Sequence, residues 1–373
     1  MRELLCNVAV LGGGPAGTAA ALALRLHVPD GSVAVFESSD YTRARAGEVL
    51  PPHARALLCQ LHVALEPLSA VTLSAEGLAS AWGSDELREQ HHLFSGHGAG
   101  LHLDRNAFDR HLAACAAAQG ATVHTQTAFQ SAIREAGGWC LRLRGGLVCH
   151  ARFVIDATGR SAVFARSQGA RARQFDALTA YSRTFAGLPP AEHQTLIEAC
   201  VSGWWYTAPL PQGRRIVSLL TDVDLARAAG LPASDAWEHA FRQTRHIAPL
   251  LESAHLIGEH IAPAATTQLN CLGGPDWLAT GDAAASCDPL SGQGITKALR
   301  SGILAAYAAA DTLSGQGPTA LARYHAMLAA HFAGFQRMHR AFHNEETRWP
   351  AEPFWLRRRS FAPPLFVPTE VAA

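Results

Sequence analysis

The alternation of apolar and polar stretches predicts a β-α-β unit at the start of the chain. Asn7–Leu11 is a short apolar run next to glycines, which predicts a buried strand. Pro15–His27 is rich in alanine and leucine and predicts a helix, and Val33–Phe36 predicts a second buried strand. A strand, a helix and a strand within about 30 residues begin a parallel sheet whose faces are covered by helices. The pattern predicts an α/β protein.

Further elements follow in two groups. Asp104 can cap a helix that runs to about Gln119, and the glycine pair Gly145-Gly146 predicts the turn of an antiparallel hairpin. The strands expected before and around that hairpin are Val123–Ala128, Trp139–Leu143 and Val148–Asp156. An antiparallel layer is expected next, with strands at Thr179–Phe185, Trp204–Pro209 and Arg215–Asp222.

The last third of the chain is expected to be mainly helical. Helices are predicted at Ala236–Thr244 and Pro249–His255, followed by a buried strand at 278–280, an alanine-rich helix and a second long helix at Thr319–Asn344. The segment from Arg348 carries five prolines, and we expect it to lack regular structure.

Charge and composition exclude several classes of protein. The chain has 31 basic and 31 acidic residues, so it lacks the positive surplus with which nucleic-acid-binding proteins neutralise phosphates. No apolar run reaches the roughly 18 residues of a membrane span. The eight cysteines form no C-x-x-C pair and are expected to be free thiols, and with no secretory leader we expect a cytoplasmic protein. Lys297 is the only lysine in the chain.

A glycine-rich motif at the first strand–helix turn indicates a dinucleotide site. Gly12, Gly14 and Gly17 match G-x-G-x-x-G, and Glu37, followed by Ser38, lies twenty residues after Gly17 at the end of the next strand. In such a site the first glycine makes the turn, the second admits a pyrophosphate and the third lets helix and strand pack. The helix start around Pro15 and Ala16 would bind phosphate through backbone N–H groups, and Glu37 would hold ribose hydroxyls.

A second motif resembles the flavin signature of the FAD-dependent monooxygenase and halogenase superfamily. Asp282 ends a strand and is followed by a glycine-rich helix start. The resemblance implies that Asp282 holds the ribityl chain of FAD and that the next segment lines the isoalloxazine ring. The residues implied there are Pro289, Gly292, Gln293, Gly294 and Ile295. Two arginines also occur in the family's order: Arg45 in the segment after the second strand and Arg105 at the start of a helix.

The resemblance implies a Rossmann-type FAD-binding domain with a parallel sheet, an antiparallel-sheet substrate domain and C-terminal helices. We expect a discontinuous FAD domain (1–75, 100–176 and 270–318), a substrate domain (76–99 and 177–269) and a C-terminal helix and tail (319–373).

The aromatic strand Gly203–Pro209 resembles the W-x-W-x-I-P signature of flavin-dependent halogenases, with Tyr206 and Ala208 as departures. Because side chains alternate along a strand, Trp204 and Tyr206 share one face and Trp205 takes the other. Trp204, Tyr206, Glu48 and Ser291 are the candidates for a substrate pocket, and no catalytic acid or base is identified. Ser291 stands where tryptophan halogenases carry a glutamate, and Lys297 lies outside the region of their halogenating lysine.

The resemblance is closer to short flavoproteins that modify tryptophan during tryptophylquinone cofactor biogenesis. It implies a monooxygenase that hydroxylates an electron-rich aromatic substrate through a C4a-hydroperoxyflavin. The substrate would be an aromatic small molecule or a tryptophan in a protein, and FAD would be reduced by NAD(P)H directly or by a separate flavin reductase. A flavin-dependent halogenase, a geranylgeranyl-reductase-like enzyme and a non-catalytic flavoprotein partner of an oxidase are the alternatives. No metal is expected, because His339 and His343 lack a third ligand in the sequence pattern.

Overall fold

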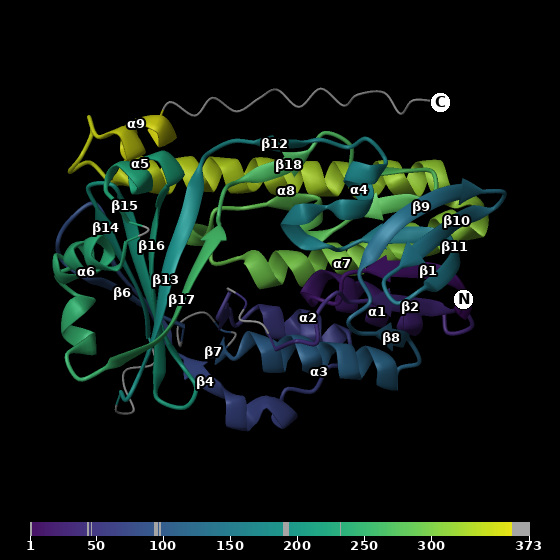
Figure 1. Cartoon of the computed structure of the whole chain (residues 1–373), viewed down its shortest axis with the longest axis horizontal. Coiled ribbons are helices and arrows are strands. Elements are labelled where there is room, and N and C mark those ends of the chain that lie inside the picture. Colours follow the sequence, from purple (N-terminus) through teal and green to yellow (C-terminus); the bar gives the residue numbers. More distant parts are fainter. Residues whose placement is uncertain are drawn as a thin grey trace.

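Two large β-sheets lie at opposite ends of the molecule, and the helix α8 (Gly317–Glu345) runs alongside both (Figure 1). The computed structural model describes residues 2–42, 45, 47–92, 96, 98–188, 194–231 and 233–359. The expected combination of a parallel sheet, an antiparallel sheet and C-terminal helices is confirmed.

The eight-stranded sheet contains the parallel core. Its order is β19 (Gly273–Gly274), β20 (Trp277–Ala279), β11 (Leu147–Asp156), β1 (Arg2–Leu11), β2 (Val33–Phe36) and β8 (Thr122–His124), and the five strands from β20 to β8 are parallel. The expected antiparallel hairpin is formed by β10 (Gly138–Leu143) and β11, and β9 (Phe129–Glu135), which was not predicted, pairs with β10. The strand expected at Val123–Ala128 is shorter than predicted, because Gln126 has a left-handed φ of 56°.

Alternate side chains of β1 enter two apolar cores. Val8 and Val10 pack with α1 (Pro15–His27), α3 (Arg105–Ala118) and α7 (Gly294–Asp311). Ala9 and Leu11 pack on the other face with Phe164 of α4 (Val163–Ser167). The apolar run of the first strand is thus explained by burial on both faces.

The seven-stranded sheet is antiparallel except for the pair β14–β5. Its order is β17 (His255–Pro263), β13 (Leu178–Ala186), β16 (Arg214–Asp222), β15 (Gly203–Leu210), β14 (Gln194–Cys200), β5 (Gly77–Ala81) and β6 (Arg88–His91). One face is covered by α6 (Ser234–Arg242), and the other packs against α9 (Pro353–Arg359). Two smaller sheets have three strands each. One contains β12 (Ala172–Gln174), β18 (Thr267–Leu269) and β21 (Ala285–Ser286), and the other contains β3 (Val49–Leu50), β7 (Gly100–Leu103) and β4 (Thr72–Ala75). The short helices are α2 (Ala54–Gln60) and α5 (Val223–Ala228).

Two predictions for the second half of the chain are wrong. The helix expected at Pro249–His255 is a short 3₁₀ turn, Ala248–Leu251, after which the chain enters the edge strand β17. The tail expected to be irregular forms α9, because Phe354 and Trp355 are fully buried and Pro353 stands at the first helical position, which proline tolerates. Among the described helices, none is long and apolar enough to cross a membrane.

Candidate flavin site

The turn between β1 and α1 forms a cradle for a pyrophosphate. A Cβ on Gly17 would lie 1.9 Å from the carbonyl oxygen of Gly12, so only glycine allows this packing. A Cβ on Gly14, in contrast, would have only the guanidinium of Arg45 near it, at 3.8 Å, and would otherwise point into open space. Gly14 caps α1 without a side-chain hydrogen bond, and the first turn of this described helix has no acidic residue. The free N–H groups and the open space fit the pyrophosphate of FAD.

Glu37 lies at the carboxyl end of β2, where the sequence places the ribose contact. Its carboxylate accepts hydrogen bonds from the backbone N–H of Gly13 at 2.7 Å and the hydroxyl of Ser39 at 2.6 Å. Burial opposes its charged form, but these bonds and the nearby Arg45 outweigh burial and lower the pKa of Glu37 below its usual value. Ser38 lies farther away, with its hydroxyl 3.4 Å from the carboxylate.

The two predicted arginines meet at one carboxylate that the sequence did not single out. Arg45 lies 2.9 Å from Glu37 and 3.0 Å from Asp109, and Arg105 lies 3.1 Å from Asp109. Asp109 is completely buried, one turn after Arg105 on α3. The i, i+4 spacing of Arg105 and Asp109 was visible in the sequence, but it is common on helices and does not by itself indicate a site.

Asp282 follows the strand β20 and faces the single lysine. The Nζ of Lys297 lies 2.7 Å from Asp282 Oδ1 and also donates to the carbonyl oxygen of Ala285, while Arg160 lies 3.7 Å from the other carboxylate oxygen. Burial opposes the charge on Asp282, but Lys297 and Arg160 outweigh it, so the pKa of Asp282 is lowered. Burial likewise opposes the charge on Lys297, yet Asp282 raises the pKa of Lys297 above its usual value.

The predicted ring segment is a short turn that leads into α7. Asp288 accepts a hydrogen bond from the N–H of Leu290 at 2.9 Å, and Pro289–Ser291 forms a 3₁₀ turn that ends at Gly292, whose φ is 60°. Gln293 precedes the helix, and Gly294 and Ile295 are its first residues; no described side chain caps this end. A helix start of this kind offers partial positive charge to an anionic ring. The donor set of both motifs therefore fits FAD.

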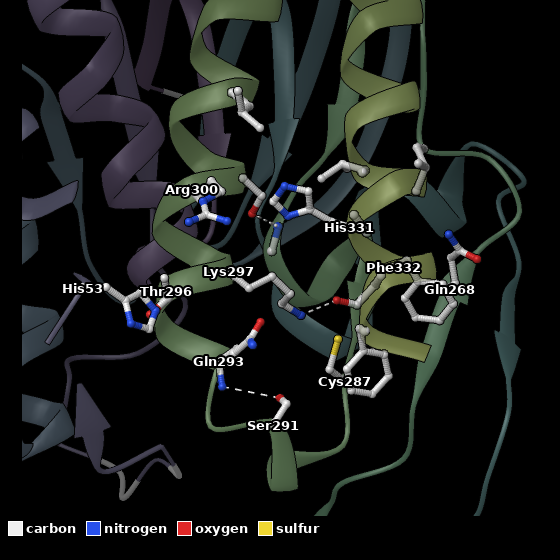
Figure 2. Close-up of a pocket in the computed structure, with 18 residues that line it drawn as sticks. His53, Gln268, Cys287, Ser291, Gln293, Thr296, Lys297, Arg300, His331 and Phe332 are labelled. Carbon is white, nitrogen blue, oxygen red and sulfur yellow. Dashed lines mark hydrogen bonds between the residues drawn. The ribbon is translucent and has the colours of Figure 1, made fainter. Parts of the chain in front are cut away.

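A cavity of about 500 Å³ lies between α7 and α8 and borders the ring segment (Figure 2). Ser291, Gln293 and Lys297 line it, and the exposed side chains of His53, Arg300 and His331 surround it. Its apolar wall is formed by Leu272, Leu304, Leu328, Phe332 and Phe335. Of the four predicted substrate-pocket residues, only Ser291 lines this cavity.

Glu48 and Tyr206 form a separate pair. The two side chains are hydrogen-bonded to each other, Glu48 is buried and Tyr206 is half-buried. Burial raises the pKa of Glu48, and burial together with the charge of Glu48 raises the pKa of Tyr206 well above its usual value. Arg215, which the sequence did not single out, is buried and donates to the hydroxyl of Thr207, the next residue of β15, at 3.4 Å. The arrangement joins the segment after β2 to the aromatic strand β15.

The two tryptophans of β15 occupy opposite faces, as predicted. Trp205 packs against Trp237 of α6, with ring centroids 5.1 Å apart. Trp204 is 1% exposed and packs in a cluster with Trp82, Phe354 and Trp355. Its indole Nε1 is buried without a hydrogen-bond partner among the described residues. The structure therefore places Trp204 in an aromatic core, while its neighbour Tyr206 reaches Glu48.

The histidines at 339 and 343 have a neighbouring carboxylate that their spacing in the sequence does not reveal. Asp288 lies 3.0 Å from His339 through Oδ2 and Nε2, although it is 51 residues away in sequence. Burial opposes the charge on Asp288, but His339 and His343 outweigh it and lower its pKa to about 2. Burial lowers the pKa of His343 to about 3.

Comparison with known proteins places this arrangement among flavoenzymes. A model of the tryptophan halogenase family matches residues 60–371. LodB of Marinomonas mediterranea, whose name assigns it to FAD-dependent oxidoreductases, is 29% identical over 363 residues, which cover 95% of this chain and 96% of LodB. The myxobacterial chondrochloren halogenase CndH superposes with a TM-score of 0.86 at 21% identity, covering 95% of this chain and 86% of its own. QhpG, a peptidyl tryptophan dihydroxylase essential for tryptophylquinone cofactor biogenesis, superposes with a TM-score of 0.73 at 25% identity, covering 95% and 78% of the two chains.

Proposed function

The chain belongs to the tryptophan halogenase family and is an FAD-dependent oxidoreductase, and from this premise we propose that it hydroxylates an electron-rich aromatic ring, specifically the indole of a tryptophan in a protein or peptide. The family membership and the FAD cofactor agree with the expectations from the two glycine-rich motifs. Two points go beyond the family and the cofactor: the reaction inserts oxygen instead of a halogen, and the ring that reacts is that of a tryptophan.

The observation that carries the proposal is the position of Lys297. In tryptophan halogenases, which this chain resembles, a lysine between the flavin and the substrate delivers the halogen. This chain has only one lysine, Lys297. Its ammonium group is held by Asp282 and by the carbonyl oxygen of Ala285. Arginine cannot replace a proton-exchanging amine, because the guanidinium stays protonated in proteins. The chain therefore has no free lysine for halogen transfer, whereas oxygen transfer needs none.

Two further facts support a tryptophan in a protein as the substrate. QhpG, which resembles this chain over 95% of its length at 25% identity, acts on peptidyl tryptophan. The position of the halogenase family's indole-side glutamate is occupied here by Ser291, which lines the cavity beside α7. A free-tryptophan pocket of the halogenase kind would therefore lack one of its anchoring groups.

Bound FAD, once reduced, supplies the activation of molecular oxygen. The residues of this chain would bind and orient the cofactor: the α1 start and Gly14 at the pyrophosphate, Glu37 at the ribose and Asp282 at the ribityl chain. The start of α7 at Gly294 would place backbone N–H groups at the ring. A separate flavin reductase or NAD(P)H would supply the electrons.

Glu48 is our candidate for the group that moves a proton. Hydroxylation of an aromatic ring requires removal of a proton from the carbon that is attacked. The carboxyl of Glu48 is buried, its pKa is raised, and the phenol of Tyr206 orients it by a hydrogen bond. A carboxylate whose pKa is raised towards neutrality is a more effective general base at pH 7. We assign proton removal to the Glu48 carboxylate and its orientation to Tyr206.

Halogenation is the second candidate, and the match to the tryptophan halogenase family model favours it. Incubation of a tryptophan-containing peptide with the protein, reduced FAD, oxygen and chloride separates the two reactions. Hydroxylation adds about 16 or 32 Da to the peptide, and chlorination adds about 34 Da with the chlorine isotope pattern. A chlorinated indole as the main product would overturn the proposal.

A further inference from the structure

Three buried side chains meet behind the ring segment, and we call them the Asp-His-His cluster: Asp288, His339 and His343. Asp288 precedes the turn that leads to α7, while both histidines lie on α8, four residues apart. Their exposed fractions are 0%, 7% and 0%. One ligand-capable atom from each residue lies within 4.8 Å of those of the other two. The cluster is separate from every group to which we assign a role in binding FAD or in moving a proton.

The hydrogen bonds of His343 fix its protonation pattern. Its Nδ1 lies 2.8 Å from the backbone carbonyl oxygen of His339. Because a carbonyl oxygen only accepts hydrogen bonds, Nδ1 is the donor, and in the neutral ring Nε2 then carries the lone pair. This Nε2 is buried and has no hydrogen-bond partner among the described residues. Metal-binding histidines commonly donate their second ring N–H to a backbone carbonyl in this way.

One carboxylate oxygen of Asp288 points to the histidines, and the other accepts a hydrogen bond within its own turn. Oδ1 accepts the hydrogen bond from Leu290, and Oδ2 lies 3.0 Å from His339 Nε2. Zinc binds imidazole nitrogen and carboxylate oxygen at about 2.0–2.2 Å, so tetrahedral ligand atoms lie about 3.3 Å apart. The Asp288–His339 separation is close to that value.

We propose that Asp288, His339 and His343 bind one divalent transition-metal ion, which ties α8 to the segment expected to line the flavin ring. Two imidazoles and one carboxylate suit Zn²⁺ or Fe²⁺ rather than Mg²⁺ or Ca²⁺. The site is enclosed by aromatic side chains: the ring centroid of Trp82 lies 5.8 Å from that of His343, and that of Phe335 lies 5.4 Å from that of His339. Three protein ligands leave the fourth position of a tetrahedral ion to a water molecule.

The guanidinium of Arg358 affects both Asp288 and His343, but it already has a carboxylate partner. Arg358 of α9 faces the cluster, but Asp222 holds it with two oxygens at 2.9 and 3.2 Å. The ring of Phe354 lies 3.5 Å from its guanidinium carbon. Arg358 is thus the partner of Asp222, while the hydrogen-bond partner of Asp288 on α8 is His339.

The test measures metal content rather than activity. Full-length protein is stripped with EDTA, titrated with ZnCl₂, separated from free zinc and analysed by inductively coupled plasma mass spectrometry. We expect about one zinc per chain. Asp288→Asn and His343→Gln should each weaken zinc binding at least about tenfold. His325→Gln is the matched control, because His325 also lies on α8 with a buried, unpartnered Nε2 but is outside the cluster, and this variant should keep the ion.

A second, more exposed group, Glu135, Cys140 and His150, could also take up zinc, so all measurements use a Cys140→Ser background. Circular dichroism shows whether each variant folds. If His343→Gln does not fold, Asp288→Asn still tests the site, because asparagine keeps the shape of the aspartate side chain. No zinc uptake in the Cys140→Ser protein would overturn the proposal, as would full uptake by folded Asp288→Asn. Neither result bears on hydroxylation, which is read from the product.

Discussion

The ammonium group of Lys297 lies 2.7 Å from the carboxylate of Asp282, so the only lysine of the chain is bound to the residue expected to hold the ribityl group of FAD. The two residues are fifteen positions apart, on the two sides of the ring segment. Each stabilises the charge of the other against the cost of burial. The ion pair occupies the one amine that halogen transfer would require, and we propose that it belongs to the FAD site.

Replacing Lys297 with methionine should affect binding more than chemistry. The substitution leaves Asp282 with Arg160 as its remaining partner, and we expect a loss of about 1–2 kcal/mol in stability, because the pair is only partly buried. FAD affinity should fall, while oxygenation at saturating FAD should stay within about tenfold of the wild type. Lys297→Arg, which keeps the charge, is the control. Complete loss of product in FAD-saturated, folded Lys297→Met protein would show that the amine takes part in the reaction.

Gly14→Val tests the pyrophosphate cradle without disturbing the fold. The new side chain would meet only Arg45, at 3.8 Å from its Cβ, and the backbone at Gly14 is extended, which any residue adopts. We therefore expect a normal thermal midpoint without cofactor but at least about a hundredfold loss of FAD affinity, because valine occupies the space of the phosphates. Flavin absorbance after gel filtration measures this. Gly14→Ala should be intermediate; stoichiometric FAD in Gly14→Val would contradict the assignment.

The raised pKa of Glu48 should make the stability of the protein and its activity change in opposite directions with pH. Its pKa is raised by burial above the usual 4.5, so the native protein keeps a proton that the unfolded chain loses. The stability contributed by the neutral carboxyl is fully present below pH 4.5 and decreases as the pH rises through the raised pKa. The activity assigned to the carboxylate should instead increase over the same range. In Glu48→Gln both dependences should vanish, and kcat should fall about 10²- to 10⁴-fold. Unchanged kcat in this variant would remove Glu48 from the mechanism.

The docking of α9 depends on one of two adjacent arginines. The side chain of Arg358 is 2% exposed and pairs with Asp222, whereas that of Arg357 is 45% exposed. Arg358→Ala would leave the carboxylate of Asp222 with the more exposed Arg357 alone, and we expect it to cost about 3–5 kcal/mol. Arg357→Ala should cost no more than about 1 kcal/mol. Urea denaturation measures both, and equal losses would mean that α9 is not held by the buried pair.

The sequence predicted the parallel core well because its signals are local. Buried strands were predicted from the apolar runs of β1 and β2, and a strand–helix turn was predicted from the Gly12–Gly17 motif. The helix α1 begins and ends where the pattern predicts. The alternation rule also placed Trp204 and Trp205 on opposite faces of β15. These features depend on neighbours in the sequence or on the period of a strand.

Contacts between distant segments could not be predicted in this way. The structure of α9 depends on its burial against Trp82 and Trp204, more than 100 residues earlier in the chain. His255–Pro263 becomes a strand because β13 pairs with it, although most of its side chains are exposed and show no strand-like alternation. Asp288 joins His339 only when α8 folds back along the ring segment. None of these pairings leaves a periodic signal.

The most direct test of oxygen insertion is the source of the added atom. A tryptophan-containing peptide is incubated with the protein, reduced FAD and bromide, once under ¹⁶O₂ and once under ¹⁸O₂, and its mass is measured. We predict a gain of about 16 Da per inserted oxygen in the first case and about 18 Da in the second, localised to the indole. A product with the paired bromine isotope pattern, gaining about 78 and 80 Da and unaffected by ¹⁸O₂, would contradict the account.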